Sequence, residues 1–185
     1  MVKRNVHDDM VRGAAELLAA RGVQGTSFSE VIARTGAPRG SIYHHFPGGK
    51  DELVEAAIRS VGDGVTALLD SLDASSPAKL VDAFVDGWRA VLVMGDYERG
   101  CAVAASCLGS GASDELRNVV GEVFRSWHDA LAQAFVRSGA ARRRAEDLAT
   151  VCIASVEGAL IIGRAEHDDA VFDVLKRQLR RLAAM

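Results

Sequence analysis

Residues 26–50 constrain the fold more tightly than any other stretch of this 185-residue chain. They hold two short amphipathic segments, and Gly36 and Pro38 mark a tight turn between them. Glycine tolerates the left-handed backbone of a turn, and proline suits the first turn of a helix, where its missing N–H costs nothing. Helices this short are marginal alone, so they have to pack against a third segment. The stretch predicts a small helical domain built on a helix-turn-helix.

The remainder of the chain also favours helices. The sequence has three prolines in all, and it lacks the polar–apolar alternation that marks strands. Apolar residues recur instead at helical spacing, which predicts helices over residues 5–21, 50–72, 77–94, 99–108, 114–139, 142–163 and 169–183. We therefore expect an all-α fold of about nine helices. An N-terminal three-helix domain would cover residues 1–50, and a C-terminal helical domain would cover residues 51–185.

Charge is divided unevenly between these two parts. The first 50 residues hold seven Lys and Arg against four Asp and Glu, whereas the whole chain has a net charge of −3. A basic N-terminal part on an acidic body is expected if only that part meets phosphate. The second short helix agrees, because it displays polar side chains in place of an apolar face, namely Arg39, Ser41, Tyr43, His44 and His45.

The expected partner of this polar face is the major groove of double-stranded DNA. Ser27 and Ser29 lie where the first short helix begins, so their hydroxyls and the backbone N–H groups can meet a phosphate. The alternative is that His44 and His45 are solvated residues on an ordinary helical hairpin.

Cysteine usage and hydropathy point to the cytoplasm. Cys101, Cys107 and Cys152 are odd in number and lack metal-ligand spacing, which favours a reducing compartment. The most apolar run, residues 148–163, is 16 residues long and contains Glu157, so it is too short and too charged to cross a bilayer. Because the N-terminus also lacks the apolar stretch of a signal peptide, we expect no membrane partner.

No catalytic constellation stands out in the sequence. Cys101 and Cys107 have no His or Asp at a plausible spacing for an activated nucleophile. The chain also lacks a glycine-rich phosphate loop, a pair of acid–base carboxylates and a metal cluster. We expect no enzymatic activity and no cofactor, and redox sensing by Cys101 stays an open alternative.

The segment from Gly36 to Phe46, Gly-Ala-Pro-Arg-Gly-Ser-Ile-Tyr-His-His-Phe, resembles a known signature when it is read with Lys50 and Leu53. It is similar to the helix-turn-helix of the TetR/AcrR family of bacterial transcriptional regulators. Residues 38–50 and the Gly100–Cys101 pair resemble the LmrA/YxaF-type branch of that family.

Two departures from the family pattern stand out. Pro38 replaces the usual capping serine of the second helix, and the connection Pro47–Gly48–Gly49 to Lys50 is one residue longer. The resemblance implies that phosphates are bound by Tyr43, His45 and Lys50. It also implies that base edges are read by Arg39, Ser41 and His44, with Arg39 suited to bidentate contact with guanine.

The resemblance further implies a ligand cavity inside the C-terminal domain. The candidate lining residues are Phe84, Trp88, Cys101, Phe124, Trp127, His128 and Glu157. Glu157 is the sharpest candidate, because a carboxylate in an apolar run needs a partner such as Arg164, His128 or a ligand group. The alternatives are that the aromatic residues only fill the core and that Glu157 lies on an exposed strip.

Residues 142–163 form a helix that is apolar almost all round, so it needs cover on both sides. One side would face the cavity and the other a second subunit, with residues 169–183 completing the interface. The candidate interface residues are Cys152, Ser155, Ala159, Ile162, Val171, Leu175, Gln178, Leu179 and Leu182. A monomer that buries this helix internally is the alternative.

Together these features predict a homodimeric, ligand-responsive transcriptional repressor. It would bind a near-palindromic operator and be released by a small aromatic or amphipathic effector. The competing hypothesis is a small-molecule binding protein or enzyme that retains the helix-turn-helix only as a structural unit. An activator, or a regulator without an effector, is a further rival.

Overall fold

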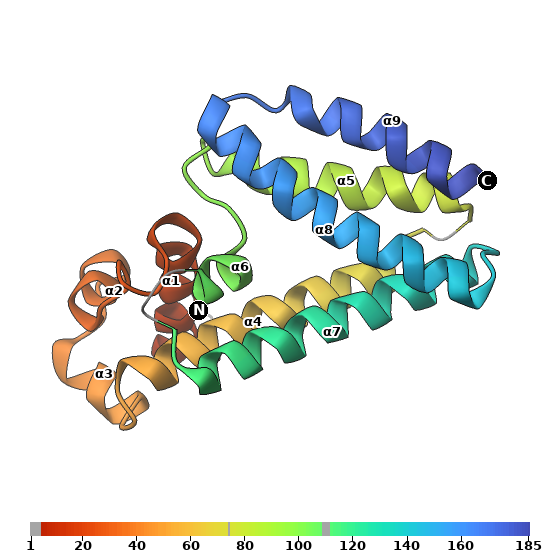
Figure 1. Cartoon of the computed structure of the whole chain (residues 1–185). Coiled ribbons are helices and arrows are strands. Elements are labelled where there is room, and N and C mark those ends of the chain that lie inside the picture. The colour runs from red at the N-terminus through yellow and green to blue at the C-terminus, as the bar shows by residue number, and fades with distance from the viewer. Residues whose placement is uncertain (1–4, 74, 109–111) are drawn as a thin grey trace. The chain divides into compact units, whose positions relative to one another are not determined.

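The computed structural model describes residues 5–73, 75–108 and 112–185 (Figure 1). Within these ranges it has nine α-helices and no strand, which confirms the predicted all-α class. The helices are α1 (Val6–Arg21), α2 (Phe28–Thr35), α3 (Arg39–His45), α4 (Lys50–Ser71), α5 (Pro77–Met94), α6 (Ala102–Cys107), α7 (Asp114–Arg137), α8 (Arg142–Glu166) and α9 (Ala170–Ala184).

The helices are grouped in two compact units. The first comprises Met1–Asp63 and Ala102–Val123, and the second comprises Gly64–Cys101 and Phe124–Met185. Helices α4 and α7 contribute residues to both units. The functional division at residue 50 that the sequence suggests stays a prediction.

In the first unit, α1 supplies the apolar face on which α2, α3 and α6 pack. Met10, Ala14, Leu17 and Leu18 of this helix are buried. Their spacing of three or four residues keeps them on one side of a helix. Asn5 caps the N-terminus of α1, because its side chain accepts a hydrogen bond from the His7 N–H at 3.2 Å.

Ser27, and not Thr26, caps α2. The Ser27 hydroxyl accepts a hydrogen bond from the Glu30 N–H at 3.3 Å, whereas buried Thr26 donates to the Gly22 carbonyl at 2.9 Å. Both residue types can cap a helix, so the sequence alone does not distinguish them. Within α2 only Val31 is fully buried, since a helix this short presents one narrow face to the core.

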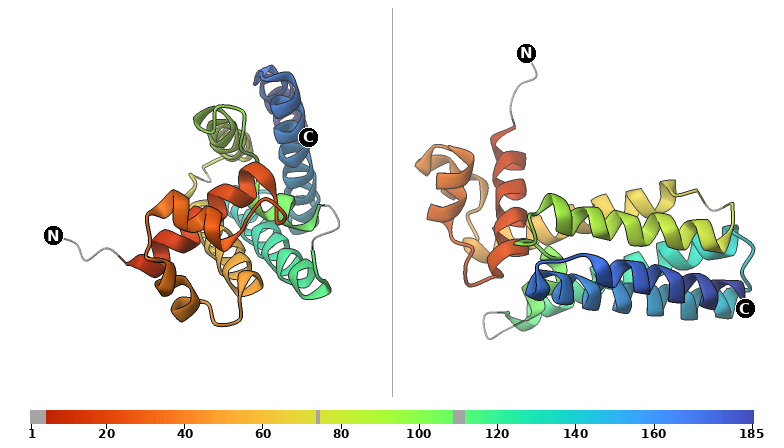
Figure 2. Two further views of the ribbon diagram at one scale, coloured as in Figure 1. Left: turned by 90° about the vertical axis from the view of Figure 1, so that its left-hand side faces the viewer. Right: turned by 90° about the horizontal axis from the view of Figure 1, so that it is seen from above.

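In the second unit, α5, α8 and α9 lie side by side (Figures 1 and 2). Their inner faces carry fully buried side chains, among them Leu80 and Leu92 of α5, Val156 of α8 and Phe172 of α9. Ser76 caps α5 by accepting a hydrogen bond from the Lys79 N–H at 3.3 Å, and Pro77 lies in the first turn, where its missing N–H costs nothing.

Ion pairs run along the contact between α5 and α9. Arg89 binds Asp169 at 2.6 Å and Asp173 at 2.8 Å. Further along the same two helices Lys176 binds Asp86, and Arg180 lies 3.5 Å from Asp82. The hydrogen bond to Asp169 raises the pKa of Arg89, and the same contact lowers the pKa of Asp169, so both groups stay ionised.

The arginine run at residues 142–144 begins α8. Arg144 donates a hydrogen bond to the Leu182 carbonyl in the last turn of α9, and Arg142 pairs with Glu146 one turn along α8. Carbonyls at a helix C-terminus lack partners within the helix, and a cation there also complements the helix dipole. Arg144 therefore ties the start of α8 to the end of α9.

We expect the Arg89→Met variant to lower the free energy of unfolding by about 1–2 kcal/mol, because it leaves Asp169 and Asp173 without their shared cation. Urea denaturation at low and high salt measures the loss, which should shrink in concentrated salt. The control is Arg142→Ala, which removes an exposed pair within one helix and should change the stability by less than about 0.5 kcal/mol. Equal losses in the two variants would contradict the role assigned to Arg89.

Candidate DNA-binding and ligand-binding sites

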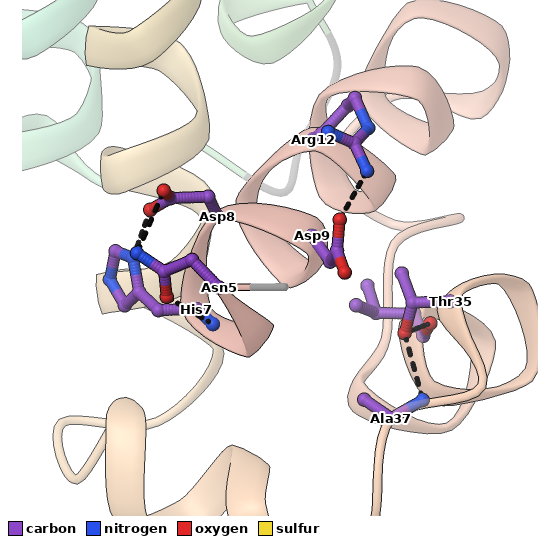
Figure 3. Close-up of polar contacts among 8 residues, drawn as sticks. Asn5, His7, Asp8, Asp9, Arg12, Thr35 and Ala37 are labelled. Carbon is purple, nitrogen blue, oxygen red and sulfur yellow. Dashed lines mark hydrogen bonds and ion pairs between the residues drawn. The ribbon is translucent and has the colours of Figure 1, made fainter. Parts of the chain in front are cut away.

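The turn between α2 and α3 is held by Thr35 and Gly36 (Figure 3). The Thr35 hydroxyl donates to the Val31 carbonyl at 2.8 Å and accepts from the Ala37 N–H at 3.3 Å. Gly36 adopts the left-handed conformation, with φ 68°. On α1, Gly13 leaves room for this turn, because a Cβ there would lie 2.6 Å from the Thr35 methyl carbon. The turn that leads into α3 is therefore held by its own hydrogen bonds and by its contact with α1.

Helix α3 is anchored from its inner side. Ile42 within it and Phe46 directly after it are fully buried. Pro38 precedes the helix without a side-chain cap, as expected when proline replaces a capping serine. The outward-facing residues are those that the sequence assigned to DNA: Arg39, Tyr43 and His44 are exposed, and Ser41 and His45 are half-buried. Tyr43 is 68% exposed although it is aromatic.

Aromatic contacts support this surface. The Tyr43 ring meets Phe28 of α2 edge-on, with ring centroids 5.4 Å apart. His7 of α1 stacks on Phe46 at 5.0 Å and meets His45 edge-on at 5.7 Å. The sequence did not single out His7, because its contacts join residues far apart along the chain.

His7 also has a polar neighbour in its own helix, as Figure 3 shows. The carboxylate of Asp8 lies 3.1 Å from His7 Nδ1 and accepts a hydrogen bond from the Asn5 amide at 2.8 Å. The start of α1 is thereby ordered beside the residues that follow α3.

The remaining DNA candidates lie at helix starts. The hydroxyls of Ser27 and Ser29 form one hydrogen bond with each other, 2.9 Å long, at the N-terminus of α2. Lys50 is the first residue of α4 and is half-buried. The longer connection before it folds as a turn in which Gly49 has φ 86° and the Gly48 N–H donates to Glu52 Oε2 at 2.7 Å. The connection that is one residue longer is thus accommodated by the left-handed Gly49 and by the hydrogen bond from Gly48 to Glu52.

Four of the seven predicted ligand residues form a chain of aromatic contacts. Phe84 and Trp88 of α5 have ring centroids 6.5 Å apart, Trp88 and Trp127 5.7 Å, and Trp127 and Phe124 of α7 5.3 Å. Phe84 and Trp88 also line an apolar hollow between the end of α4 and α5. Phe124 and Trp127 do not line it.

Glu157 and Cys101 meet within the second unit. The Cys101 thiol hydrogen-bonds to the Glu157 side chain, whose Oε1 atom is buried without a hydrogen-bond partner. Burial raises the pKa of Glu157 to about 7, and the bond from Cys101 opposes that rise. The sequence named Arg164 and His128 as partners of Glu157, but His128 donates instead to the Glu146 carbonyl at 3.2 Å.

The predicted dimer residues divide between the inside and the outside of the chain's own fold. Ser155, Val171 and Leu175 are half-buried, and Ile162, Gln178 and Leu182 are exposed. Three others are buried by the chain's own helices and do not lie on its surface: Cys152, Ala159 and Leu179. Burial also raises the pKa of the Cys152 thiol to about 12. The sequence missed three apolar residues that α8 and α9 do expose, namely Val151, Ile161 and Val174.

Two family models match the chain. Bacterial regulatory proteins of the tetR family match residues 11–57, and the C-terminal domain of LmrA/YxaF-like transcriptional regulators matches residues 77–178. The second match covers more than half of the chain. The chain belongs to the TetR family of transcriptional regulators. Its C-terminal part places it in the LmrA/YxaF-like branch, as the resemblance implied.

Known transcriptional regulators are similar to this chain over most of its length. An uncharacterized HTH-type transcriptional regulator of Mycobacterium tuberculosis is 35% identical over 94% of this chain and 91% of its own. The HTH-type transcriptional regulator LmrA of Bacillus subtilis is 26% identical over 84% of each chain. The crystal structure of the regulatory protein TetR from Rhodobacter sphaeroides shares the fold, with a TM-score of 0.84, 23% identity and coverage of 96% of this chain and 98% of that one.

The raised pKa of Glu157 predicts how stability depends on pH. The folded protein favours the protonated carboxyl, so its ionisation destabilises the fold as the pH rises from about 4.5 to about 7. We expect Glu157→Gln to match the parent protein near pH 4.5. Above pH 7 the variant should be more stable by an amount on the order of 2 kcal/mol.

Thermal and urea unfolding across this pH range measure the difference. The control is Glu166→Gln, at the exposed end of α8, which should differ little from the parent at any pH. A difference between Glu157→Gln and the parent that does not change with pH would show that Glu157 is ionised freely in the fold.

Proposed function

We propose that the protein is a homodimeric transcriptional repressor that binds a near-palindromic operator and is released by a small apolar or amphipathic effector. The observation that carries the proposal is the division of α3 into two faces. Ile42 and Phe46 anchor its inner side, while Arg39, Tyr43 and His44 face outward. A helix of a helix-turn-helix presented in this way suits the major groove.

The roles proposed for the main DNA candidates follow from their chemistry. Arg39 presents a guanidinium whose paired donors match the O6 and N7 atoms of guanine. The Tyr43 hydroxyl, the His45 imidazole and the Lys50 ammonium are donors suited to phosphate oxygens, as are the hydroxyls and N–H groups at the start of α2. Phosphate contacts would set the register, and base contacts would supply specificity.

Support for a dimer comes from α8 and α9. These helices pack against each other and leave apolar side chains exposed, including Ile161, Ile162 and Leu182. Exposed apolar side chains favour association with another protein surface. A second copy of the chain is the proposed partner, because two-fold symmetry would pair two recognition helices about 34 Å apart.

Release by an effector is supported by α4. This helix carries Lys50 at its first residue, and its later residues Val65 and Leu68 line the apolar hollow. A ligand in the hollow that favours another position of α4 would act on the DNA-binding segment through one continuous helix. To reverse operator occupancy from 99:1 to 1:99, the effector must favour the released state by about 5.5 kcal/mol.

The Arg39→Ala variant tests the role of α3. We expect specific operator affinity to fall roughly tenfold to a hundredfold, because a bidentate base contact contributes about 1–3 kcal/mol of discrimination. Non-specific binding should weaken far less. The operator is first selected from genomic fragments, and both affinities are then measured by fluorescence anisotropy.

A matched control is Arg21→Ala, which removes one charge from the same unit at a residue paired with Glu30 at 3.2 Å. It should leave the preference for the operator unchanged. An unaltered operator footprint for Arg39→Ala would remove α3 from the recognition surface. Absence of duplex binding by the parent protein at low salt would favour a small-molecule binding protein or an enzyme instead.

The dimer is tested by Ile162→Arg combined with Leu182→Arg. Burying two unpaired charges is unfavourable, so we expect the variant to sediment as a monomer and to lose operator binding. Val93→Arg is the control, because Val93 is exposed on α5 and lies outside the α8 and α9 faces. Analytical ultracentrifugation distinguishes the outcomes, and an unchanged dimer in the double variant would exclude this interface.

A further inference from the structure

The hollow between the end of α4 and α5 is built almost entirely of hydrocarbon. Phe84 and Trp88 are buried in its wall, and two of its leucine and valine residues are unusually open to solvent, with Leu68 53% and Val91 42% exposed. The full lining is Val65, Leu68, Leu69, Leu72, Ala83, Phe84, Gly87, Trp88 and Val91. None of these side chains carries a charge, and their one hydrogen-bonding group is the indole N–H of Trp88.

Gly87 is the unexpected member of this lining. It lies in the interior of α5, where glycine is less favourable than alanine because its unfolded backbone has more freedom to lose. Close packing does not require it, since a Cβ at this position would meet no atom within 4 Å apart from its own helix backbone and its two neighbours in the chain. Because Gly87 lines the hollow together with Trp88, its missing side chain leaves the hollow wider at this point.

We infer that Gly87 keeps open a subsite for an uncharged apolar group, a flat aromatic ring or a short hydrocarbon chain, that binds against Trp88. The inference rests on the proposed function and specifies the chemistry of the effector. A charged group would lose its hydration here without gaining a partner, whereas an apolar group covers Leu68 and Val91 as it binds. Discrimination in this subsite depends on size and shape.

Substitution at Gly87 separates the subsite from the fold. Gly87→Leu should fill the hollow with the side chain itself, and Gly87→Ala should fill it in part. Both residues favour helices more than glycine does, so neither is expected to lower the melting temperature. Gly64→Leu is the matched control, because Gly64 is an exposed glycine of α4 whose added Cβ also meets no atom within 4 Å and which does not line the hollow.

The probe is N-phenyl-1-naphthylamine, a neutral fluorescent aromatic compound, and energy transfer from tryptophan reports its binding. We expect binding to the parent and to Gly64→Leu with equal affinity, roughly tenfold or more weaker binding to Gly87→Leu, and an intermediate affinity for Gly87→Ala. Equal affinity for all four proteins would overturn the subsite. Preference of the parent for a sulfonated or a cationic analogue over the neutral probe would overturn the ligand class.

Operator binding is measured on the same samples and tests the proposed function separately. Loss of probe binding in Gly87→Leu with intact operator binding supports both the subsite and the DNA-binding role. Probe binding by a parent protein that binds no operator leaves the subsite in place and contradicts the repressor. If circular dichroism shows that Gly87→Leu is unfolded, Gly87→Ala becomes the test. The affinity of Gly87→Ala for the probe then has to be lower than that of the parent for the inference to stand.

Discussion

Burial of Ile42 and Phe46 is the contact on which the DNA-binding segment depends. Helix α3 has seven residues, too few for its own hydrogen bonds to keep it folded. Its stability comes from these two side chains, four residues apart and fully buried, together with the stacking of His7 on Phe46. The same spacing turns Tyr43 and His44 outward. Folding and presentation of the polar face are therefore consequences of one packing arrangement.

Charge determines how α5 and α9 are aligned. On α5, Asp82 pairs with Arg180 and Asp86 with Lys176 of α9. Arg89 pairs with Asp173 of α9 and with Asp169 directly before it, so the two helices run antiparallel. A slip of one helical turn would bring Arg89 toward Lys176, and the like charges would repel. Apolar burial supplies most of the stability, and the ion pairs discriminate against shifted alignments.

Local signals in the sequence predicted most of the fold and part of the candidate sites. Capping residues and prolines such as Ser27 and Pro77 act within one turn, so their roles are legible without a structure. Contacts between distant residues are not, which is why His7 against Phe46 and the two carboxylates of Arg89 escaped notice. Periodicity also fails for α8: because this helix is apolar almost all round, its pattern does not distinguish buried Cys152 and Ala159 from exposed Ile161.

Glu157 is half-buried because α8 has no polar face on which a carboxylate could be fully exposed. In α8 the carboxyl lies between the buried stripe and the exposed one, close enough to the core to lose its water and to bond Cys101. An ionised carboxylate in such a place is destabilising, and sequences that keep such groups commonly do so for function. In the proposed regulator the hollow at Gly87 selects an apolar shape, whereas Glu157 does not line that hollow and is a separate polar group whose raised pKa lets its charge change near neutral pH.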